Sequence, residues 1–288
     1  MKKIAVIDIG SNSVRLMIMA DGKVLYKRLQ TTRLGEGLAH STRLKPEAIE
    51  RSAQAVSTFY SVAQAENAEE IAAFATAAVR SAENGQAFVA RVSELCPLQV
   101  EIVSGETEAE IGILGALGTR DGGVIDVGGA STEIVYKQKG DIIYKQSENV
   151  GVVRLKDVCG RDEQCLKNYC EQMVGAYKNL PCQENFYAIG GTATTLAAWK
   201  LHLQEYSSEK VTGTVITKAE MQTLAKELLA KSVEEIAAFP CMPTGRADVL
   251  AGGAFWLYTV MDKLEIPSLI VSDRDNLEGY AISKGLNV

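Results

Sequence analysis

The stretch Gly123–Val135 decides the fold of this chain and reads GVIDVGGASTEIV. An apolar run ends in Asp126, a Gly-Gly turn follows, and a second β-rich run begins with hydroxyl side chains. This order predicts a β-hairpin whose glycines allow a bound group to approach the backbone. Successive turn amides and hydroxyls form a concave anion site, and an aspartate beside it offers oxygen to a hard cation. We therefore expect a phosphate site here; the alternative is an ordinary hairpin whose glycines only relieve strain.

The same order of elements occurs near the N-terminus, in Val6–Leu16, which reads VIDIGSNSVRL. The aspartates of the two copies, Asp8 and Asp126, are 126 − 8 = 118 positions apart. A repeat at this distance indicates two similar domains. We expect a hairpin from each domain to line a cleft between them, where ligands of two-domain proteins usually bind. The turn residues predicted to contact phosphate are Ser11, Asn12, Ser13, Gly128, Gly129, Ala130 and Ser131.

Composition limits the class of protein. The chain has 288 residues, of which 47% are apolar and 23% are charged, so it is long enough for two globular domains. The net charge of −6 argues against a broad nucleic-acid-binding surface, and no apolar run is long enough to span a membrane. The first residues lead directly into a predicted strand, so we expect no secretory signal and a cytoplasmic location. A small-molecule ligand is expected, with neither nucleic acid nor membrane as a partner. Whether the chain forms a homodimer is left open by the sequence.

The cysteine and histidine residues form no pattern that is typical of a metal site or a catalytic site. The six cysteines lack a regular metal spacing, and we expect reduced thiols rather than a disulfide framework. Four of them cluster, at Cys159, Cys165, Cys170 and Cys182, where a metal knuckle or a redox pair is the less favoured alternative because the gaps are longer than zinc sites prefer. Neither His40 nor His202 lies near a motif, so acid–base chemistry is expected to fall to carboxylates.

Two segments that follow predicted strands carry groups suited to anions. From the end of its strand Arg80 can reach the cleft and bind phosphate with both guanidinium nitrogens, although a surface arginine is the alternative. A later strand ends in Gly190, Gly191 and Thr192 and enters a helix, which predicts an anion or nucleotide platform. The alternative for this second segment is close strand–helix packing through glycine.

A helix is predicted from the N-cap Ser104 to about Leu117, with three acids near its start. Acids in a first turn favour the helix dipole, which is one explanation for them. On a helix, however, Glu106 and Glu110 share a face, whereas Glu108 lies about 200° around the axis from Glu106. We therefore expect Glu108 to face the cleft.

Taken together, these motifs resemble those of the exopolyphosphatase and guanosine pentaphosphate phosphatase family, within the actin-like ATPase superfamily. The resemblance covers nearly the whole chain. It is carried by Asp8–Leu16, Arg33–Gly37, Ala75–Gly85, Ser104–Ala109, Gly123–Val135, Gly190–Thr192 and Gly245–Asp248. It implies an α/β fold of two actin-like (ribonuclease H-like) domains with a ligand cleft between them, which we place at residues 1–120 and 121–288.

The resemblance also implies roles for individual residues. Glu108 would be the general base, and Asp126 and Glu133 would help to place Mg²⁺. We add Asp8 to the predicted magnesium ligands, because these carboxylates would otherwise crowd negative charge beside a polyanion. The arginines that the resemblance implies as phosphate contacts are Arg15, Arg80 and Arg246.

Three positions depart from the usual pattern of that family. Thr107 stands where a second acid is usual, and Ala130 stands where a third glycine is usual. The segment Asp275–Gly279 reads DNLEG in place of Gly-Leu-Arg-Glu-Gly. The larger members carry an added C-terminal helical domain, which we do not expect in this protein. Substrate preference is therefore the least determined of the expected properties.

The expected reaction is hydrolysis of the terminal phosphoanhydride of inorganic polyphosphate, with guanosine pentaphosphate as a second substrate. One alternative is an ATP-dependent kinase of the same superfamily. A second alternative is a guanosine tetraphosphate-binding sensor with little turnover. The products separate them: phosphate release without an acceptor indicates hydrolysis, acceptor-dependent ADP indicates a kinase, and binding without turnover indicates a sensor.

Overall fold

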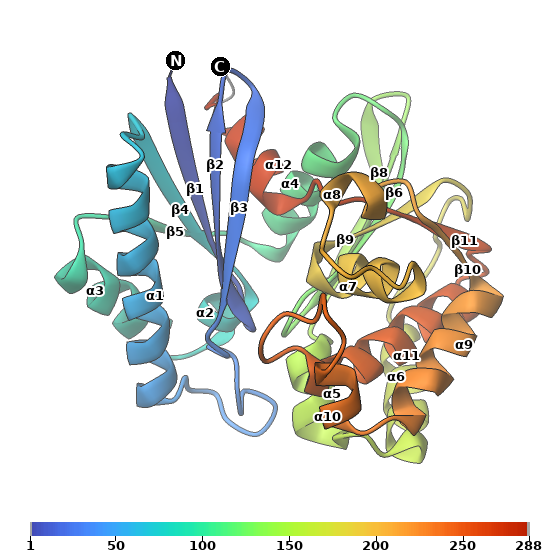
Figure 1. Ribbon diagram of the computed structural model, residues 1–288. Helices are drawn as coiled ribbons and strands as arrows, with labels where there is room; N and C mark the ends of the chain where they lie inside the picture. Colours follow the sequence, from blue (N-terminus) through green and yellow to red (C-terminus); the bar gives the residue numbers. More distant parts are fainter. Residues whose placement is uncertain (1, 287–288) are drawn as a thin grey trace.

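Two mixed β-sheets, each covered by helices, form two α/β domains that lie side by side in the computed structural model, which describes residues 2–286 (Figure 1). The strands of the first sheet are β1 (Lys3–Ile9), β2 (Ser13–Ala20), β3 (Lys23–Thr31), β4 (Glu70–Ala75) and β5 (Val100–Ile102). Those of the second are β6 (Gly122–Val127), β7 (Thr132–Gln138), β8 (Asp141–Glu148), β9 (Phe186–Ile189), β10 (Val215–Thr217) and β11 (Ser268–Val271).

Helices fill the connections and the last part of the chain. They are α1 (Pro46–Ala65), α2 (Ala77–Ser81), α3 (Gly85–Leu95), α4 (Gly105–Leu117), α5 (Val152–Cys159), α6 (Glu163–Val174), α7 (Gly190–Lys200), α8 (Ser208–Val211), α9 (Lys218–Ala230), α10 (Val233–Ala237), α11 (Ala247–Lys263) and α12 (Asn276–Ser283). None of the described helices is both long and apolar enough to cross a membrane.

The two sheets share one topology, which confirms the internal repeat predicted from the sequence. The first has the order β3-β2-β1-β4-β5, and the second has the same pattern in β8-β7-β6-β9-β11, with β10 added at the edge. In each sheet the first three strands are antiparallel neighbours, and the next two run parallel to the first. The predicted α/β fold of two actin-like domains is thereby confirmed.

The turns of the two predicted hairpins are built alike and touch each other. In β1–β2 the Gly10 amide donates to the Ser13 carbonyl at 3.0 Å, and in β6–β7 the Gly128 amide donates to the Ser131 carbonyl at 3.0 Å. A Cβ on Gly129 would lie 2.8 Å from Cβ of Ser11, so glycine is needed for the turns to meet. The contact brings the ends of both hairpins to one place.

Helix α4 lies between the two sheets. Ile111 packs with Ile4 in the core of the first sheet, and Ile113 packs with Val124 in the core of the second. A helix that contacts apolar layers on both sides is apolar around most of its circumference, as expected for a buried helix. Its position fixes the direction of every side chain in its first turn, including Glu108.

The last helix, α12, packs across α4 and returns to the first sheet, where Tyr280 stacks on Phe74 with ring centroids 4.4 Å apart. The helices cross closely because Gly279 has no side chain: a Cβ there would lie 1.7 Å from the Ile111 carbonyl oxygen. The strands divide at the predicted boundary, but α12 connects the two halves. The division into residues 1–120 and 121–288 stays a prediction.

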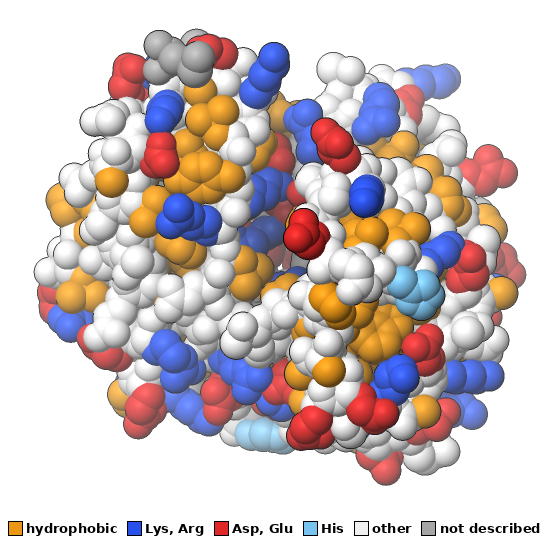
Figure 2. Space-filling view, viewed as in Figure 1, with side chains coloured by type: hydrophobic (Ala, Val, Ile, Leu, Met, Phe, Trp, Pro, Cys, Tyr) orange, Lys and Arg blue, Asp and Glu red, His pale blue; other side chains and the backbone are white. Residues whose placement is uncertain are grey.

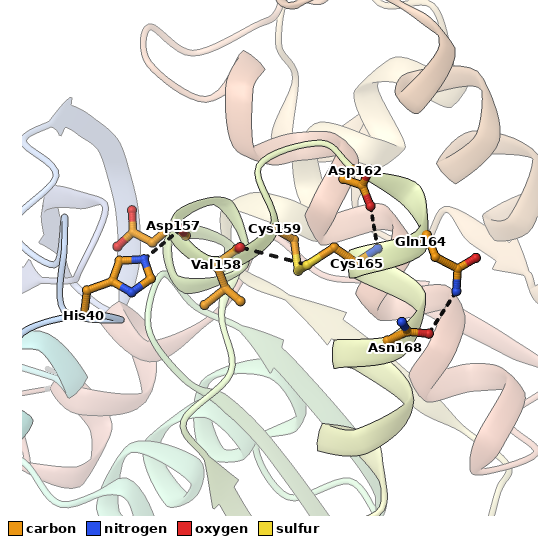
Figure 3. Close-up of a disulfide and its surroundings, with 8 residues drawn as sticks. All are labelled: His40, Asp157, Val158, Cys159, Asp162, Gln164, Cys165 and Asn168. Carbon is orange, nitrogen blue, oxygen red and sulfur yellow. Dashed lines mark hydrogen bonds between the residues drawn. A yellow bond between two sulfur atoms is a disulfide. The ribbon is translucent and has the colours of Figure 1, made fainter.

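The expectation that all cysteines are reduced is wrong for one pair. Cys159 and Cys165 form a disulfide, shown in Figure 3, with Cα atoms 5.3 Å apart. Helix α5 ends at Cys159, and the Asp162 side chain accepts from the Cys165 amide to begin α6, so the turn between the helices brings the thiols together. Cys170 and Cys182 are free thiols, as are the remaining two cysteines.

Candidate active site

A narrow cavity of about 70 Å³ lies where the two hairpin turns meet. Figure 2 shows the groove between the two halves of the molecule, with Lys and Arg side chains inside it. The predicted site residues that line the cavity are Asp8, Ser11, Asn12, Ser13, Arg15, Glu108, Asp126, Gly128, Gly129, Ser131, Gly190, Gly191, Thr192 and Arg246. Three predicted residues, Arg80, Ala130 and Glu133, do not line it. The repeat therefore identified most of one continuous site.

The turns present backbone donors to this cavity. Among residues 2–286, no protein acceptor is paired with the backbone amides of Ser11, Asn12, Gly129 and Ala130. The carbonyls of Gly128 and Gly129 accept instead from the first amides of α5, at 3.0 and 2.8 Å, which holds the second turn in place. Unpaired amides at a buried turn fit an anion that supplies the missing acceptors.

Four carboxylates are buried around the cavity. Asp8 lies near the end of β1 opposite Arg15 of β2, and Asp126 lies near the end of β6 opposite Glu133 of β7. Their exposed fractions are 4% for Asp8, 7% for Asp126 and 2% for Glu133, and Glu108 is 6% exposed. Isolated buried carboxylates are unfavourable unless they are paired, protonated or bound to a cation. The site therefore contains buried carboxylates that need a positive partner, a bound cation or a proton.

Glu108 points into the cavity, which confirms the expectation drawn from helix geometry. The Ser104 side chain caps α4 by accepting from the Thr107 amide at 3.0 Å, while the side chain of Glu106 is 75% exposed and pairs with Lys145. Burial raises the pKa of Glu108 to about 7, against the opposing effect of Arg80, which donates to Glu108 Oε2 at 2.8 Å. A carboxylate with a pKa near neutrality is suited to accept a proton from water.

The two acids of the second hairpin are held by neutral partners. Asn276 donates to Asp126 Oδ2 at 2.8 Å, and Ser147 donates to Glu133 Oε1 at 2.6 Å. Burial raises the pKa of Asp126 to about 6 and raises the pKa of Glu133 well above its usual value. The charges of Glu108 and Asp126 raise the pKa of Glu133 further, because like charges nearby disfavour ionisation.

Arg246 is a buried cation without a carboxylate partner among the described residues. Its side chain donates to the Gly191 carbonyl at 2.7 Å and to the Thr195 hydroxyl at 3.2 Å. Burial lowers the pKa of Arg246 to about 10, and the nearby charge of Arg15 adds to the effect. Since a guanidinium with this pKa remains charged at neutral pH, an anion in the cavity would complete its coordination.

The other two predicted phosphate contacts are engaged elsewhere. The guanidinium of Arg15 donates to Asp8 and to Asp275, and that of Arg80 donates to Glu108 and, at 2.9 Å, to the Val103 carbonyl. Arg80 also lies within α2 rather than at the end of β4. Contacts of Arg15 and Arg80 with phosphate stay predictions, and their observed partners are carboxylates.

No three acidic, histidine or cysteine side chains in residues 2–286 form a ready-made metal site, so Asp8, Asp126 and Glu133 are not gathered as three ligands of one ion. Several of the buried oxygens without a hydrogen-bond partner among the described residues nevertheless belong to side chains in or beside the cavity. They are Asp8 Oδ1, Asn12 Oδ1, Glu133 Oε2 and Asn276 Oδ1. Buried oxygens of this kind fit a hard cation that takes one or two carboxylates together with water and substrate oxygens. The magnesium site stays a prediction that the residues present would fit.

Sequence reasoning missed six lining residues and one residue that pairs with Arg15. The lining residues are Gly10, Thr76, Ala77, Val127, Val152 and Asn276. Asp275, which lines a neighbouring cavity, caps α12 and pairs with Arg15. The one available signal was the departure of residues 275–279 from the expected motif, which places two polar side chains where the resemblance has glycine and leucine.

Two duplicated α/β domains with an acid-lined cavity at their junction define the class of protein: a two-domain fold with one candidate site between the domains. A family model described as the Ppx/GppA phosphatase family matches residues 4–287. The chain belongs to this family. Its reaction class is accordingly hydrolysis of phosphoanhydride bonds.

Individual relatives cover nearly the whole chain. Exopolyphosphatase 2 of Mycobacterium tuberculosis is 28% identical over 313 residues, which cover 98% of both chains. A guanosine-5'-triphosphate,3'-diphosphate pyrophosphatase of Vibrio vulnificus is 30% identical over 298 residues, covering 98% of this chain and 58% of the relative. The crystal structure of the Aquifex aeolicus member of the Ppx/GppA family matches with a TM-score of 0.80 at 29% identity, covering 99% of this chain and 98% of that chain.

The buried Glu133 predicts a specific dependence of stability on pH in the absence of divalent cations. Its pKa is raised in the folded state, so the folded protein binds a proton that the unfolded chain has lost, and wild-type stability falls as pH rises above about 4.5. Glu133→Gln removes this loss. We expect the variant to melt at a higher temperature than wild type, by a margin that grows from about pH 5 to about pH 8.

Glu106→Gln is the matched control, because the side chain of Glu106 is 75% exposed. It should shift the melting temperature little, and equally at both pH values. Thermal melts of the three proteins in chelator measure the effect, and a Glu133→Gln margin that stays constant or shrinks with rising pH would contradict the explanation.

Proposed function

We propose that this protein is an exopolyphosphatase that releases the terminal phosphate of inorganic polyphosphate. The observation that carries the proposal is the position of Glu108, a buried carboxylate with a pKa of about 7, in one cavity with unpaired turn amides and Arg246. The amides and the guanidinium match the oxygens of a terminal phosphoryl group. The carboxylate is suited to accept a proton from the water that attacks that group.

In the proposed reaction, the residues present account for the proton that water loses, the bond that forms and the bond that breaks. Glu108 accepts a proton from water while the water oxygen forms a bond to the terminal phosphorus. The bond between that phosphorus and its bridging oxygen breaks, and the shortened chain leaves with this oxygen. Turn amides and Arg246 stabilise charge on the non-bridging oxygens, which is the main requirement in phosphoryl transfer. Arg80 holds Glu108 in place through its hydrogen bond to Oε2.

Magnesium is the proposed cofactor. Asp8 and Glu133 each have a buried oxygen without a partner among the described residues, and the charge of Asp8 raises the pKa of Asp126 as that of Asp126 raises the pKa of Glu133. These side chains would hold the ion directly or through water, as carboxylates commonly do for Mg²⁺. The bound ion would supply positive charge to the phosphate oxygens.

Guanosine pentaphosphate is the second proposed substrate, favoured by a second cavity of about 390 Å³ beside the first. The two cavities share Arg15, Gly190, Gly191 and Arg246. The walls of the second include Leu29, Met242 and Pro243, apolar groups that suit a nucleoside and offer nothing to a phosphate chain. The predicted platform at residues 190–192 lies at this junction.

A phosphate-release assay tests the proposed function. Wild-type protein with Mg²⁺ should release phosphate from polyphosphate without any acceptor, should act on guanosine pentaphosphate, and should release little from ATP. Excess chelator should abolish the activity, and added Mg²⁺ should restore it. Acceptor-dependent ADP formation would favour a kinase, binding of guanosine tetraphosphate without turnover would favour a sensor, and full activity in chelator would refute the magnesium site.

The role of Glu108 is tested against its close neighbour on the same helix. Glu108→Gln should keep the fold and lower kcat by roughly 10²–10⁴-fold, because a carboxamide cannot accept the proton from water. Glu106→Gln should change kcat little. In wild type kcat/KM should fall as the pH drops below about 7, where Glu108 becomes protonated.

Equal kcat values for wild type and Glu108→Gln, with both proteins folded, would assign the base elsewhere. The helix-dipole explanation predicts that result together with a small loss of stability, about 0.3–1 kcal/mol, for either substitution. The two explanations therefore differ in kcat and not in stability.

A further inference from the structure

Asp275 reaches the cleft from the far end of the chain. It is 4% exposed and caps α12, with Oδ1 accepting from the Leu277 amide at 3.0 Å and Oδ2 accepting from Nη1 of Arg15. The close crossing of α12 over α4 holds it there, since a Cβ on Gly115 would lie 1.9 Å from the Asp275 carbonyl oxygen. This carboxylate therefore has a fixed position between the two domains.

Arg15 is shared by two carboxylates. Its Nε donates to Asp8 Oδ2 at 2.9 Å, its Nη2 donates to the same oxygen, and its Nη1 donates to Asp275. A single positive charge thus faces two negative charges at hydrogen-bond distance. Arg246, which lines the same cavity, has no such partner among the described residues. The two arginines of the cavity therefore offer very different attraction to a phosphate chain.

The neutralised Arg15 stands at the passage between the two cavities, because it lines both of them. Beyond it, the second cavity is bordered by Asp273 as well as Asp275. Its Lys27 is also engaged, donating to the Asp273 carbonyl at 2.6 Å and pairing with Glu278 at 2.8 Å. Arg28 and Arg246 line the second cavity too and pair with no carboxylate among residues 2–286. A polyphosphate chain that continued from the first cavity into the second would therefore pass these two arginines, but at the passage it would also meet Asp275 and an Arg15 that is already paired.

We propose that Asp275 is a specificity-determining residue that neutralises Arg15 at this passage and thereby disfavours long polyphosphate chains. The proposal rests on the proposed function of the same site. A chain that ends within the first cavity places no phosphate beside Asp275. Such a chain avoids the repulsion, whereas a long chain does not.

Asp275→Asn tests the proposal with little disturbance of the fold. Asparagine is as good an N-cap as aspartate, so the hydrogen bond to the Leu277 amide is kept while the charge is removed. With Nη1 of Arg15 free to donate to phosphate, KM for long-chain polyphosphate should fall by about tenfold, the worth of one charge-assisted hydrogen bond. KM for tripolyphosphate should fall by much less, and the gain for long chains should fade at high salt.

Glu101→Gln is the matched control. Glu101 accepts from the Tyr280 hydroxyl at 2.7 Å and pairs with Lys284 at 2.7 Å, so the change removes one negative charge beside α12 but outside both cavities. It should leave the ratio of the two KM values unchanged. In an Arg15→Met background, Asp275→Asn should no longer alter that ratio, because the effect acts through Arg15.

Several results would overturn the proposal: an unchanged or higher KM for long chains in folded Asp275→Asn, or equal falls for both substrates. Asp275→Ser, which keeps a capping oxygen, replaces the asparagine variant if that variant unfolds. If the wild type releases no phosphate from any polyphosphate, the proposed function fails on its own. The role of Asp275 is then decided by calorimetric Kd values for the same two polyphosphates, with the same predicted change in their ratio.

Discussion

The contact between two equivalent β-turns sets the geometry of this protein. Because Gly129 lacks a side chain, its turn lies against Ser11, and the ends of two duplicated hairpins face one small cavity. Helix α4, packed between both sheets, adds Glu108 to the same space. Three separate parts of the chain therefore contribute to one site, and each is held there by apolar packing that lies outside the cavity.

This arrangement favours function over stability. Four carboxylates are buried in or beside the cavity, and burial raises the pKa of each of them above its usual value. Arg15 and Arg80 offset part of the charge. Among residues 2–286, Glu133 has a hydroxyl as its partner and Arg246 pairs with no carboxylate. Unpaired acids beside an unpaired cation and free amides are expected where a cation and a polyanion bind together.

Local patterns in the sequence predicted the hairpins, the orientation of Glu108 and the strand–helix platform, because each depends on spacing within a few residues. The partners of the arginines were not predictable in this way. Arg15 and Asp275 are 260 positions apart, and only the crossing of α12 over α4 brings them together. The disulfide was missed for a different reason: it depends on a tight turn between α5 and α6 that cysteine spacing alone does not reveal.

A crystal structure of the Glu108→Gln variant with tripolyphosphate and Mg²⁺ tests the central claim most directly. The account predicts that the terminal phosphate lies between the two hairpin turns, within hydrogen-bond distance of amides from both and of Arg246. It also predicts that Arg15 remains bound to Asp8 and Asp275. Phosphates lying outside the turns, with the turn amides unoccupied, would contradict the assignment of this cavity as the site of hydrolysis.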